Sequence, residues 1–341
     1  MSYRITLIPG DGIGPEITKA TAKVLEHSGV KIDWEVVEAG VAALEKYHDP
    51  LPQEVIDSID KNRIALKGPL TTPVGKGFRS INVALRKEFE LYVNQRPAKT
   101  YKGIKSLYFD NIDLIIFREN LEEFYSGIEH YIDSSRSAAE TIGIITKRGS
   151  ERIIRYAFNY AKKHGRKKIT LVHKANILKF TGGLFLDVGE EVAKEFPEVQ
   201  FDHKIVDNMA MQMVMNPYQF DCIVTTNLFG DILSDLASGL VGGLGMAPGA
   251  NIGDGVAMFE AVHGSAPDIA GQNLANPAAI MLASVMMLEY IGEVKAAMNL
   301  EKAIAKVIAE GKNVTKDINQ QNYVSTDQFA DAVINELDNL N

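Results

Sequence analysis

The sequence predicts an α/β protein of two domains, and three observations support this prediction. The chain has 341 residues, more than one ordinary hydrophobic core usually organises. Its composition is that of a globular protein, with 46% hydrophobic and 23% charged residues and neither low-complexity tracts nor repeats. Short apolar runs alternate with longer amphipathic runs, which is the order of βαβ units around a largely parallel sheet.

The expected strands and helices follow one another along most of the chain. The strand-like runs lie at 5–8, 31–39, 64–69, 113–117, 168–173, 201–207 and 220–227. The amphipathic, helix-like runs lie at 17–29, 53–62, 150–165 and 183–196. Because the alternation continues beyond the middle of the chain, we expect α/β architecture throughout.

Two stretches have the composition of domain boundaries. Residues 94–106 are polar and contain Pro and Gly, and residues 238–255 are dense in glycine. The second stretch lacks the Gly-Lys-Ser/Thr ending of a phosphate-binding loop, so we interpret it as a hinge or a crossing between domains. If both are crossings, residues 1–97 and 241–341 form a large domain from the two ends of the chain, and residues 98–240 form a small one.

Two segments suggest contacts at the surface or between subunits. Residues 125–146 alternate loosely and carry little that would fill a core. They predict a surface hairpin or, alternatively, an arm that pairs with another subunit. The methionines within 209–215 are typical of a core or a subunit interface, where adaptable apolar side chains pack well.

Charge and cysteine content exclude several classes of protein. The net charge is −8 and the pI is near 5.5, which disfavours nucleic acid or an acidic membrane as a partner. The longest apolar run, 277–288, is too short to span a bilayer. The chain opens on a strand-like run, so we expect no targeting segment. The single cysteine, Cys222, excludes a disulfide framework, and we expect a cytoplasmic protein with this residue buried.

The amino-terminal motif LIPGDGIGPE, at 7–16, superficially suggests a dinucleotide-binding fingerprint. Its glycines lie at 10, 12 and 14, which is not the G-x-G-x-x-G spacing. Pro15 stands where a helix would begin, a position that proline favours. We therefore expect a simple strand-turn-helix here, and a cofactor site elsewhere.

Three carboxylates indicate a metal site. Asp231 and Asp235 lie four residues apart, so in a helix they project from the same face. A solvated face would explain an arbitrary pair, but the flanking residues here are apolar. A hard divalent cation such as Mg²⁺ or Mn²⁺ between them is favoured. Asp207, where a strand-like run gives way to the Met-rich segment, offers a third carboxylate.

Other polar residues follow strand-like runs or gather in one short region. Lys174 follows the run 168–173, at the edge where α/β active sites form, and burial could lower its pKa enough for it to act as a base. Arg118 ends another run and could clamp a carboxylate, and Tyr125 could deliver a proton. Each of these is weak evidence alone. The region from 79 to 96 adds the anion-binding side chains Ser80, Asn82, Arg86 and Arg96.

Taken in order, several motifs resemble those of the β-decarboxylating dehydrogenases, from about residue 3 to the last helix. They are GDGIGPE at 10–16, REN at 118–120, HKAN at 173–176, TTNLFGDILSDL at 225–236 and HGSAPDIAG with ANP at 263–277. That family contains isocitrate, isopropylmalate, homoisocitrate and tartrate dehydrogenases. The resemblance implies oxidation of a 2-hydroxy acid with NAD or NADP, aided by Mg²⁺ or Mn²⁺, and decarboxylation of the β-keto acid. It also implies a homodimer or higher homo-oligomer with a two-domain fold that is not a Rossmann fold, and shared active sites in the interdomain cleft.

The resemblance also implies roles for individual residues. Asp231 and Asp235 of one subunit and the partner's Asp207 would hold the metal. The partner's Lys174 would assist removal of the substrate hydroxyl proton, and Tyr125 would protonate the carbanion left when carbon dioxide departs. One departure is that Leu121, Glu123 and Phe124 replace the family's usual Thr, Gly and acidic residue, so the loop before Tyr125 could differ in shape.

The substrate is expected to be isocitrate. Arg86, Arg96 and Arg118 would bind the two carboxylates that all family substrates share. Ser80 and Asn82 could hydrogen-bond a third carboxylate, whereas beside an isopropyl group they would stay unpaired at about 1–3 kcal/mol each. Isopropylmalate is therefore disfavoured. Homoisocitrate is harder to exclude, since one methylene is worth only about 1–3 kcal/mol.

The cofactor is expected to be NAD. Relatives that use NAD resemble this chain in having an acidic and then an apolar residue where Asp268 and Ile269 stand, whereas NADP relatives tend to have Lys and Tyr. A carboxylate can accept hydrogen bonds from ribose hydroxyls and would repel a 2′-phosphate. The remaining cofactor residues implied by the resemblance are Thr71 and Thr72 near the nicotinamide, and His263, Gly264, Ser265, Ala266 and Asn276 around the adenosine.

Two further hypotheses from other classes remain. The chain could be a non-catalytic regulatory subunit of a heteromeric isocitrate dehydrogenase, although such subunits are expected to lose parts of the catalytic set that is present here. It could also be a metal-binding structural protein, which would leave the adenosine loop unexplained.

Overall fold

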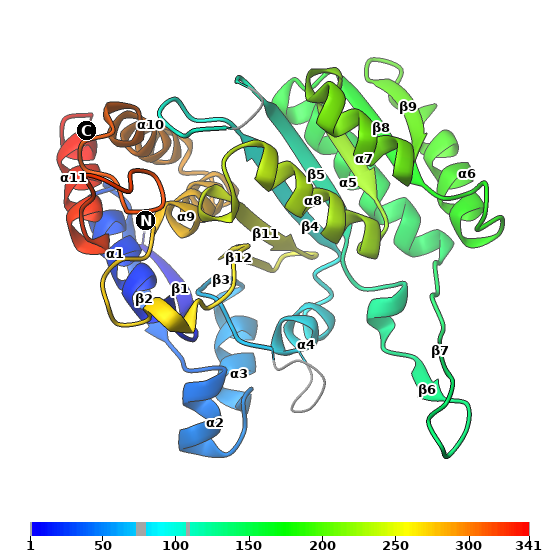
Figure 1. Ribbon diagram of the computed structural model, residues 1–341, viewed down its shortest axis with the longest axis horizontal. Helices are drawn as coiled ribbons and strands as arrows, with labels where there is room; N and C mark the ends of the chain where they lie inside the picture. Colours follow the sequence, from blue (N-terminus) through cyan, green and yellow to red (C-terminus); the bar gives the residue numbers. More distant parts are fainter. Residues whose placement is uncertain (1, 73–79, 107–109, 341) are drawn as a thin grey trace.

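The computed structural model describes residues 2–72, 80–106 and 110–340. Within these residues the centre of the molecule is a ten-stranded sheet in the order β2-β1-β3-β12-β11-β4-β5-β10-β8-β9. Its strands are β1 (Ser2–Ile8), β2 (Lys31–Val36), β3 (Ile64–Lys67), β4 (Val93–Lys99), β5 (Asp113–Glu119), β8 (Lys168–His173), β9 (Gln200–Ile205), β10 (Cys222–Thr225), β11 (Pro248–Ile252) and β12 (Ala257–Ala261). Neighbours pair in parallel at both wings, but β12, β11, β4 and β5 pair antiparallel at the centre. The α/β class with a mixed sheet is confirmed (Figure 1).

Helices cover both faces of this sheet. They are α1 (Gly14–Glu26), α2 (Val41–Tyr47), α3 (Gln53–Asn62), α4 (Ile81–Glu88), α5 (Lys147–His164), α6 (Thr181–Ala193), α7 (Val206–Met215), α8 (Asn227–Leu240), α9 (Ala278–Tyr290), α10 (Val294–Glu310) and α11 (Thr326–Asp338). Successive residues of β5 enter different cores, because strand side chains alternate between the two faces. Ile115 and Phe117 pack in the core formed with α5 and α9, whereas Leu114 and Ile116 pack in the core with α7 and α8.

The order of the strands separates the ends of the chain from its middle. Strands up to β4, together with β11 and β12, form one half of the sheet, and β5, β8, β9 and β10 form the other. The glycine-dense stretch 238–255 carries the chain from α8 into β11, and so from one half to the other. The polar stretch 94–106 differs from the expectation of a boundary loop, because its first part, up to Lys99, belongs to β4, a central strand. The division into domains at 97 and 241 stays a prediction.

Strand β4 is polar for a physical reason. Asn94, Gln95 and Arg96 are all buried, and buried polar side chains are stable only when they are hydrogen-bonded. Asn94 donates to Asn251 at 2.7 Å, and Arg96 donates to Asn94 at 2.6 Å. The strand therefore carries a buried polar network in place of an apolar pattern.

The amino-terminal motif forms a strand-turn-helix, as expected, and clamps other loops. Gly12 has a φ of +57°, and a Cβ there would lie 2.0 Å from the carbonyl oxygen of Ser265. The carboxylate of Asp11 accepts hydrogen bonds from the backbone N–H groups of Val41 and Thr71, at 2.7 and 2.8 Å. Ile13 donates to the carbonyl of Ser265 at 2.9 Å. The turn thus fixes the loops that precede α4 and follow β12.

Residues 125–146 form the predicted surface hairpin. Its strands are β6 (Glu129–Tyr131) and β7 (Ala139–Thr141), which pair antiparallel and are exposed. In Figure 1 the hairpin extends away from the body of the protein. Several of its apolar residues are exposed, including Ile128, Tyr131 and Ile132. Pairing of this arm with another subunit stays a prediction.

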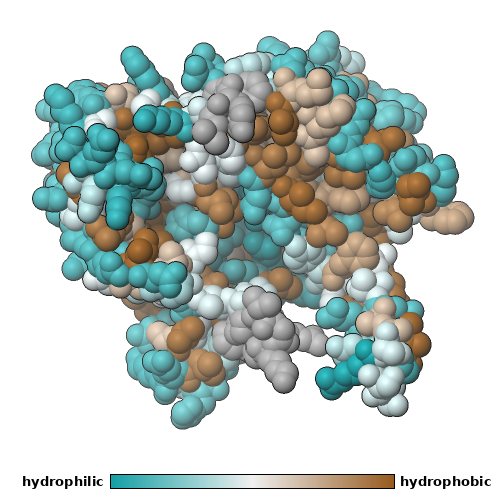
Figure 2. Space-filling view, viewed as in Figure 1, coloured by the Kyte–Doolittle hydropathy of each residue, from teal (hydrophilic) through white to brown (hydrophobic). Residues whose placement is uncertain are grey.

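The surface also carries apolar side chains on α7 and α8. Met209 and Met213 are buried, whereas Met211 and Met215 are exposed. Exposed Ile232 lies on the neighbouring α8, and Figure 2 shows hydrophobic residues gathered over α8. We call the exposed side chains of Met211, Val214, Met215 and Ile232 the α7–α8 patch.

The single cysteine lies where it was expected. Cys222 is buried, and burial raises the pKa of its thiol to about 12, which keeps it unreactive. Across the described ranges, no helix combines the length and the apolar character that a membrane span requires.

Candidate active site

A polar cleft lies where the two halves of the sheet meet. Its volume is about 240 Å³. It is lined by Lys67, Pro69, Leu70, Ser80, Asn82, Val83, Arg86, Arg96, Arg118, Tyr125, Asp231, Glu260, Ala261, Val262, His263 and Gly264. The cleft therefore brings together the five predicted substrate residues with Tyr125 and Asp231.

Three buried arginines give the cleft its positive charge. Arg118 donates through Nε and Nη2 to Oδ1 of Asn227, at 3.0 and 2.7 Å, and through Nη1 to Asp231 at 2.5 Å. Burial and then the charges of Arg96 and Arg86 lower the pKa of Arg118 to about 10, so it stays protonated at neutral pH. The three guanidinium groups repel one another, and a bound polyanion would relieve that repulsion.

Arg86 and Arg96 are held by separate partners. Arg86 lies 3.4 Å from Oε1 of Glu260, and Arg96 donates through Nη1 to Ser234 at 2.6 Å. Burial lowers the pKa of Arg96, and the charge of Asp231 partly opposes that change. Fixed side chains of this kind cost a ligand little ordering entropy on binding.

Ser80 and Asn82 stand at the start of α4, beside the arginines. The Ser80 hydroxyl caps the helix by accepting from the backbone N–H of Val83 at 3.4 Å, and Thr72 donates to it at 3.4 Å. Oδ1 of Asn82 is buried and has no hydrogen-bond partner among the residues that the structure describes. An amide with unused hydrogen-bonding capacity suits a polar ligand group better than an apolar one.

Tyr125 is aligned by a carboxylate and an arginine. Its hydroxyl donates to Oδ2 of Asp231 at 2.7 Å, and the guanidinium of Arg118 lies 4.9 Å from the centre of its ring. Burial and the hydrogen bond to Asp231 raise the pKa of Tyr125. The phenol is therefore protonated at neutral pH and can act as a proton donor.

Glu123, one of the unusual residues in the loop before Tyr125, has a structural role. Glu123 is buried, with a φ of +63°. Its carboxylate accepts from the backbone N–H of Leu228 at 2.7 Å, at the amino-terminal end of α8. The helix dipole and this hydrogen bond favour a negative charge there, but burial outweighs them and raises the pKa of Glu123. Glu123 thus ties the Tyr125 loop to the helix that carries Asp231.

Asp231 and Asp235 project from one face of α8 toward Arg96, at 3.4 and 3.5 Å from Nη1. Burial alone would raise the pKa of Asp231, but Arg118, Tyr125 and Arg96 outweigh it and the pKa is lowered. Burial raises the pKa of Asp235. Two carboxylates one helical turn apart fit part of the oxygen shell of Mg²⁺ or Mn²⁺.

Asp207 and Lys174 lie together but not in the cleft. Lys174 donates to Oδ1 of Asp207 at 2.6 Å, and neither residue is among those that line the cleft. Within the described part of one chain, no three His, Cys, Asp or Glu side chains form a metal-binding group. The predicted metal site thus needs a third ligand from outside this chain or from the solvent.

A second cavity, of about 660 Å³, adjoins the cleft and shares His263 and Gly264 with it. Ala266, Ile269 and Asn276 also line it. Burial lowers the pKa of His263, so the ring is neutral at neutral pH. A large, mostly apolar cavity with a few polar groups fits an adenosine moiety. We call it the adenosine cavity.

The other predicted cofactor residues, Thr71, Thr72, Ser265 and Asp268, are not among those that line this cavity. Thr71 is hydrogen-bonded to Ser265, with their hydroxyl oxygens 2.8 Å apart. Asp268 is exposed and does not line the cavity, although the adjacent Ile269 does. Asp317, which the sequence reasoning missed, lines it and accepts from Asn276 at 2.9 Å.

A buried ion pair beneath the arginines was not predicted from the sequence. Lys67 and Glu260 lie 2.7 Å apart and are almost fully buried. Lys67 ends the parallel strand β3, and its position at a strand end was a signal that could have identified it. Glu260 had no such signal, because it lies inside the apolar run that forms β12.

Comparisons with known proteins agree with this geometry. A model of the isocitrate/isopropylmalate dehydrogenase family matches residues 4–333. A probable mitochondrial NAD isocitrate dehydrogenase subunit alpha from Drosophila melanogaster is 50% identical, over 92% of this chain and 83% of that protein. An NADP isocitrate dehydrogenase from Thermus thermophilus is 48% identical, over 98% of this chain and 67% of that protein.

The fold has a close counterpart among solved structures. The crystal structure of isocitrate dehydrogenase from Methylococcus capsulatus superposes with a TM-score of 0.96 and is 55% identical. The match covers 98% of this chain and 99% of that one. Sequence, fold and site geometry lead to one conclusion: the chain belongs to the isocitrate/isopropylmalate dehydrogenase family of enzymes.

Proposed function

We propose that this enzyme is an NAD-dependent isocitrate dehydrogenase, which converts isocitrate to 2-oxoglutarate and carbon dioxide. The observation that carries the proposal is the lining of the polar cleft, where Ser80 and Asn82 stand beside three arginines. Two substrate carboxylates match the arginines, and a third carboxylate matches the serine and asparagine. An isopropyl group there would leave the side chains of Ser80 and Asn82 without a polar partner from the substrate, at a cost of about 1–3 kcal/mol each.

In this proposal the arginines bind and orient the substrate. Tyr125 holds the proton that the carbanion carbon receives after carbon dioxide leaves. The hydrogen bond to Asp231 and the raised pKa keep that proton on the phenol at neutral pH. Lys174 of a second copy of the chain would accept the hydroxyl proton, directly or through water.

A divalent cation, Mg²⁺ or Mn²⁺, would be held by Asp231 and Asp235 together with Asp207 of a second copy. When bound, such a cation polarises a hydroxyl and stabilises an enolate. The fit rests on the two aligned carboxylates of α8. A homodimer or higher homo-oligomer follows from the same requirement, and the exposed α7–α8 patch lies on the helices that carry these aspartates.

NAD is the proposed cofactor, and NADP is the alternative. The loop from His263 to Ile269 and Asn276 would surround the adenosine, with Thr71 and Thr72 near the nicotinamide. Asp317 adds a carboxylate to the wall of the adenosine cavity. This carboxylate can accept hydrogen bonds from a ribose diol and disfavours a 2′-phosphate, while Lys316 in the same wall carries the opposite charge. The NADP-dependent relative keeps the alternative open for experiment.

Steady-state kinetics of the purified chain tests this function. With Mg²⁺ and NAD, kcat/KM for isocitrate should exceed that for homoisocitrate and isopropylmalate. A higher value for either of the other two acids would overturn the substrate. Absence of turnover with all three acids would favour the hypothesis of a regulatory subunit that needs a catalytic partner.

A further inference from the structure

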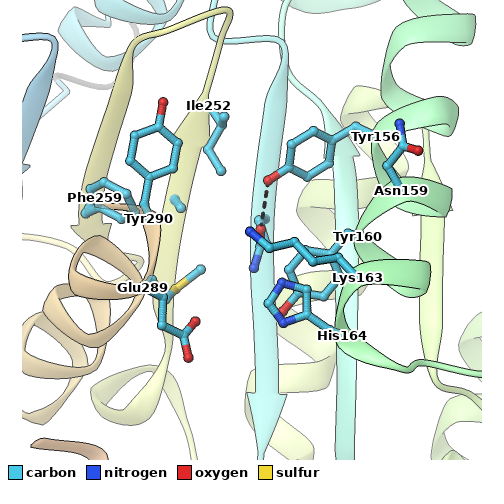
Figure 3. Close-up of a pocket in the computed structure, with 12 residues that line it drawn as sticks. Tyr156, Asn159, Tyr160, Lys163, His164, Ile252, Phe259, Glu289 and Tyr290 are labelled. Atoms are coloured by element: carbon cyan, nitrogen blue, oxygen red, sulfur yellow. Dashed lines mark hydrogen bonds between the residues drawn. The ribbon is translucent and has the colours of Figure 1, made fainter. Parts of the chain in front are cut away.

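A third cavity lies behind the polar cleft, on the opposite face of the sheet (Figure 3). Its volume is about 330 Å³, and its lining includes Gln95 of β4 and Phe259 of β12. These residues directly precede Arg96 and Glu260, which line the polar cleft. Successive strand residues face opposite sides of a sheet. We call this the rear cavity, since only the sheet separates it from the cleft.

Helices from the two halves of the sheet form its walls. Lys163 and Tyr156 come from α5, and Glu289 and Tyr290 come from α9. In Figure 3 the rings of Tyr156 and Tyr290 stand on opposite sides of an open space. A molecule in this space would contact both halves of the sheet at once.

The rings that line the rear cavity are braced from behind. Tyr156 and Tyr160 each meet the ring of Phe117 edge-on, with centroids 5.9 and 5.1 Å apart. Phe259 and Tyr290 meet edge-on at 5.8 Å. Aromatic rings fixed in this way offer edges and faces to another flat ring without losing rotamer freedom.

Polar groups of opposite charge stand on the two walls. The ammonium of Lys163 and the carboxylate of Glu289 both line the cavity. Both residues are exposed to solvent. Burial, followed by the charge of Glu301, raises the pKa of Glu289, and Lys163 opposes that change. A ligand that enters the cavity can therefore offer a counter-charge to each of these exposed groups.

We propose that the rear cavity binds a small molecule that combines an aromatic ring with an ammonium and a carboxylate group, as an aromatic α-amino acid does. The ring lies among Tyr156, Tyr160 and Tyr290. The carboxylate pairs with Lys163 and the ammonium with Glu289. A ligand with a single charge leaves one of these two protein charges unpaired, so charge complementarity selects the zwitterion. The proposal uses no residue of the polar cleft and is independent of the substrate.

Calorimetric titration of the full chain with L-tryptophan tests the site. Tryptamine lacks the carboxylate, indole-3-propionate lacks the ammonium and L-alanine lacks the ring. Since a charge-assisted hydrogen bond is lost in the first two cases, tryptophan should bind at least about tenfold more tightly than either. Alanine should not bind measurably. Equal affinity for the three indoles, or no saturable binding of tryptophan, would overturn the proposal.

Charge-removing variants test the two contacts separately. Lys163→Gln should abolish the preference for tryptophan over tryptamine, and Glu289→Gln should abolish the preference over indole-3-propionate. Lys162→Gln is the matched control, because Lys162 is the adjacent residue of α5, pairs with Glu198 at 3.1 Å and does not line the cavity. An equal loss of tryptophan affinity in this control would contradict the assignment.

Competition separates the rear cavity from the polar cleft. Saturating isocitrate with Mg²⁺ should leave stoichiometric tryptophan binding in place, because the two sites lie on opposite faces of the sheet. Displacement of tryptophan from the chain by isocitrate, with unchanged affinity in the Lys163→Gln variant, would place the indole in the cleft and overturn the proposal.

Discussion

The side-chain amide of Asn251 donates a hydrogen bond to the carboxylate of Glu260 across 2.6 Å, beneath the polar cleft. On its other side, Oδ1 of Asn251 accepts from Asn94 at 2.7 Å. Glu260 contacts Arg86, and Asn94 accepts from Arg96. Asn251 therefore links two arginines of the cleft through a chain of buried polar contacts.

Replacing this amide should weaken substrate binding. In Asn251→Leu, the buried partners lose hydrogen bonds to charged and polar groups worth about 1.5–3 kcal/mol. We expect kcat/KM for isocitrate to fall roughly 10- to 100-fold, mainly through KM. Steady-state kinetics measures both parameters. Asn299→Leu is the control, because Asn299 is buried on α10 and outside the cleft. An equal rise of KM in the control would contradict this role.

The Lys67–Glu260 pair should make stability depend on pH. Burial alone would raise the pKa of Glu260, but Lys67 and Arg86 outweigh it and hold the pKa well below its usual range. Because this pKa is lower in the folded protein than in the unfolded chain, the ionised carboxylate stabilises the fold at pH values above its unfolded pKa. The stabilisation is lost as the pH falls through the folded pKa.

Glu260→Gln should therefore lower the free energy of unfolding by about 3–5 kcal/mol at neutral pH, because it leaves a buried lysine unpaired. The difference in the free energy of unfolding between this variant and the natural protein should be constant near pH 7 and should shrink below about pH 4. Urea unfolding at several pH values measures it. Lys67→Met/Glu260→Gln should recover part of the loss, and an undiminished difference in acid would contradict the linkage.

The class of fold was predictable from local patterns, whereas most cleft residues were predicted through the resemblance of their motifs to a known family. Of the cleft residues, Arg118 was recognisable at the end of a strand and Asp231 by its helical spacing from Asp235. Glu260 and Asn251 were not, because their partners lie far away in the sequence: Glu260 meets Lys67, and Asn251 meets Asn94. Pairing between distant strands decides which buried polar residue is satisfied, and no local spacing carries that information.

The centre of the sheet was missed for a related reason. The sequence of β4 predicted a polar domain boundary, since polar residues such as Asn94 and Arg96 interrupt the apolar pattern expected of a buried strand. The side chains of Asn94 and Arg96 find hydrogen-bond partners on β11 and α8, which follow much later in the chain. Likewise, Asp317 contributes to the adenosine cavity from a loop after α10 that contains none of the motifs.

Tyr125→Phe should remove the proton donor while keeping the fold. The variant loses the hydrogen bond to Asp231 and the proton that the phenol supplies. A positioned general acid is worth about 10²- to 10⁴-fold, so kcat should fall within that range with little change in KM. The control Tyr131→Phe changes an exposed tyrosine of the hairpin and should leave kcat unchanged. Full activity of Tyr125→Phe would exclude its role as a proton donor.

Cofactor preference should depend on the charges around the adenosine cavity. Asp268→Lys with Ile269→Tyr should raise the NADP/NAD ratio of kcat/KM, because a lysine attracts a 2′-phosphate that an aspartate repels. The interaction of two charges near a surface is worth up to about 4 kcal/mol before screening. Asp317→Asn, tested separately, asks whether the carboxylate that lines the cavity shares this role. If only Asp317→Asn changes the ratio, the discriminating carboxylate is Asp317 and not Asp268.

Substrate preference should follow Ser80 and Asn82. Replacing both with apolar residues, in Ser80→Ala/Asn82→Leu, removes the groups proposed to bind the third carboxylate and offers apolar surface instead. Each lost contact is worth about 1–3 kcal/mol, so kcat/KM for isocitrate should fall roughly 10- to 100-fold or more, and that for isopropylmalate should rise. Ser135→Ala, in the exposed hairpin, is the control for an unspecific effect of losing a hydroxyl. Because the arginines are untouched, both acids should still bind through their shared carboxylates. An unchanged ratio of kcat/KM between the two acids would mean that the start of α4 does not determine substrate preference. Another wall of the cleft would then select the substrate.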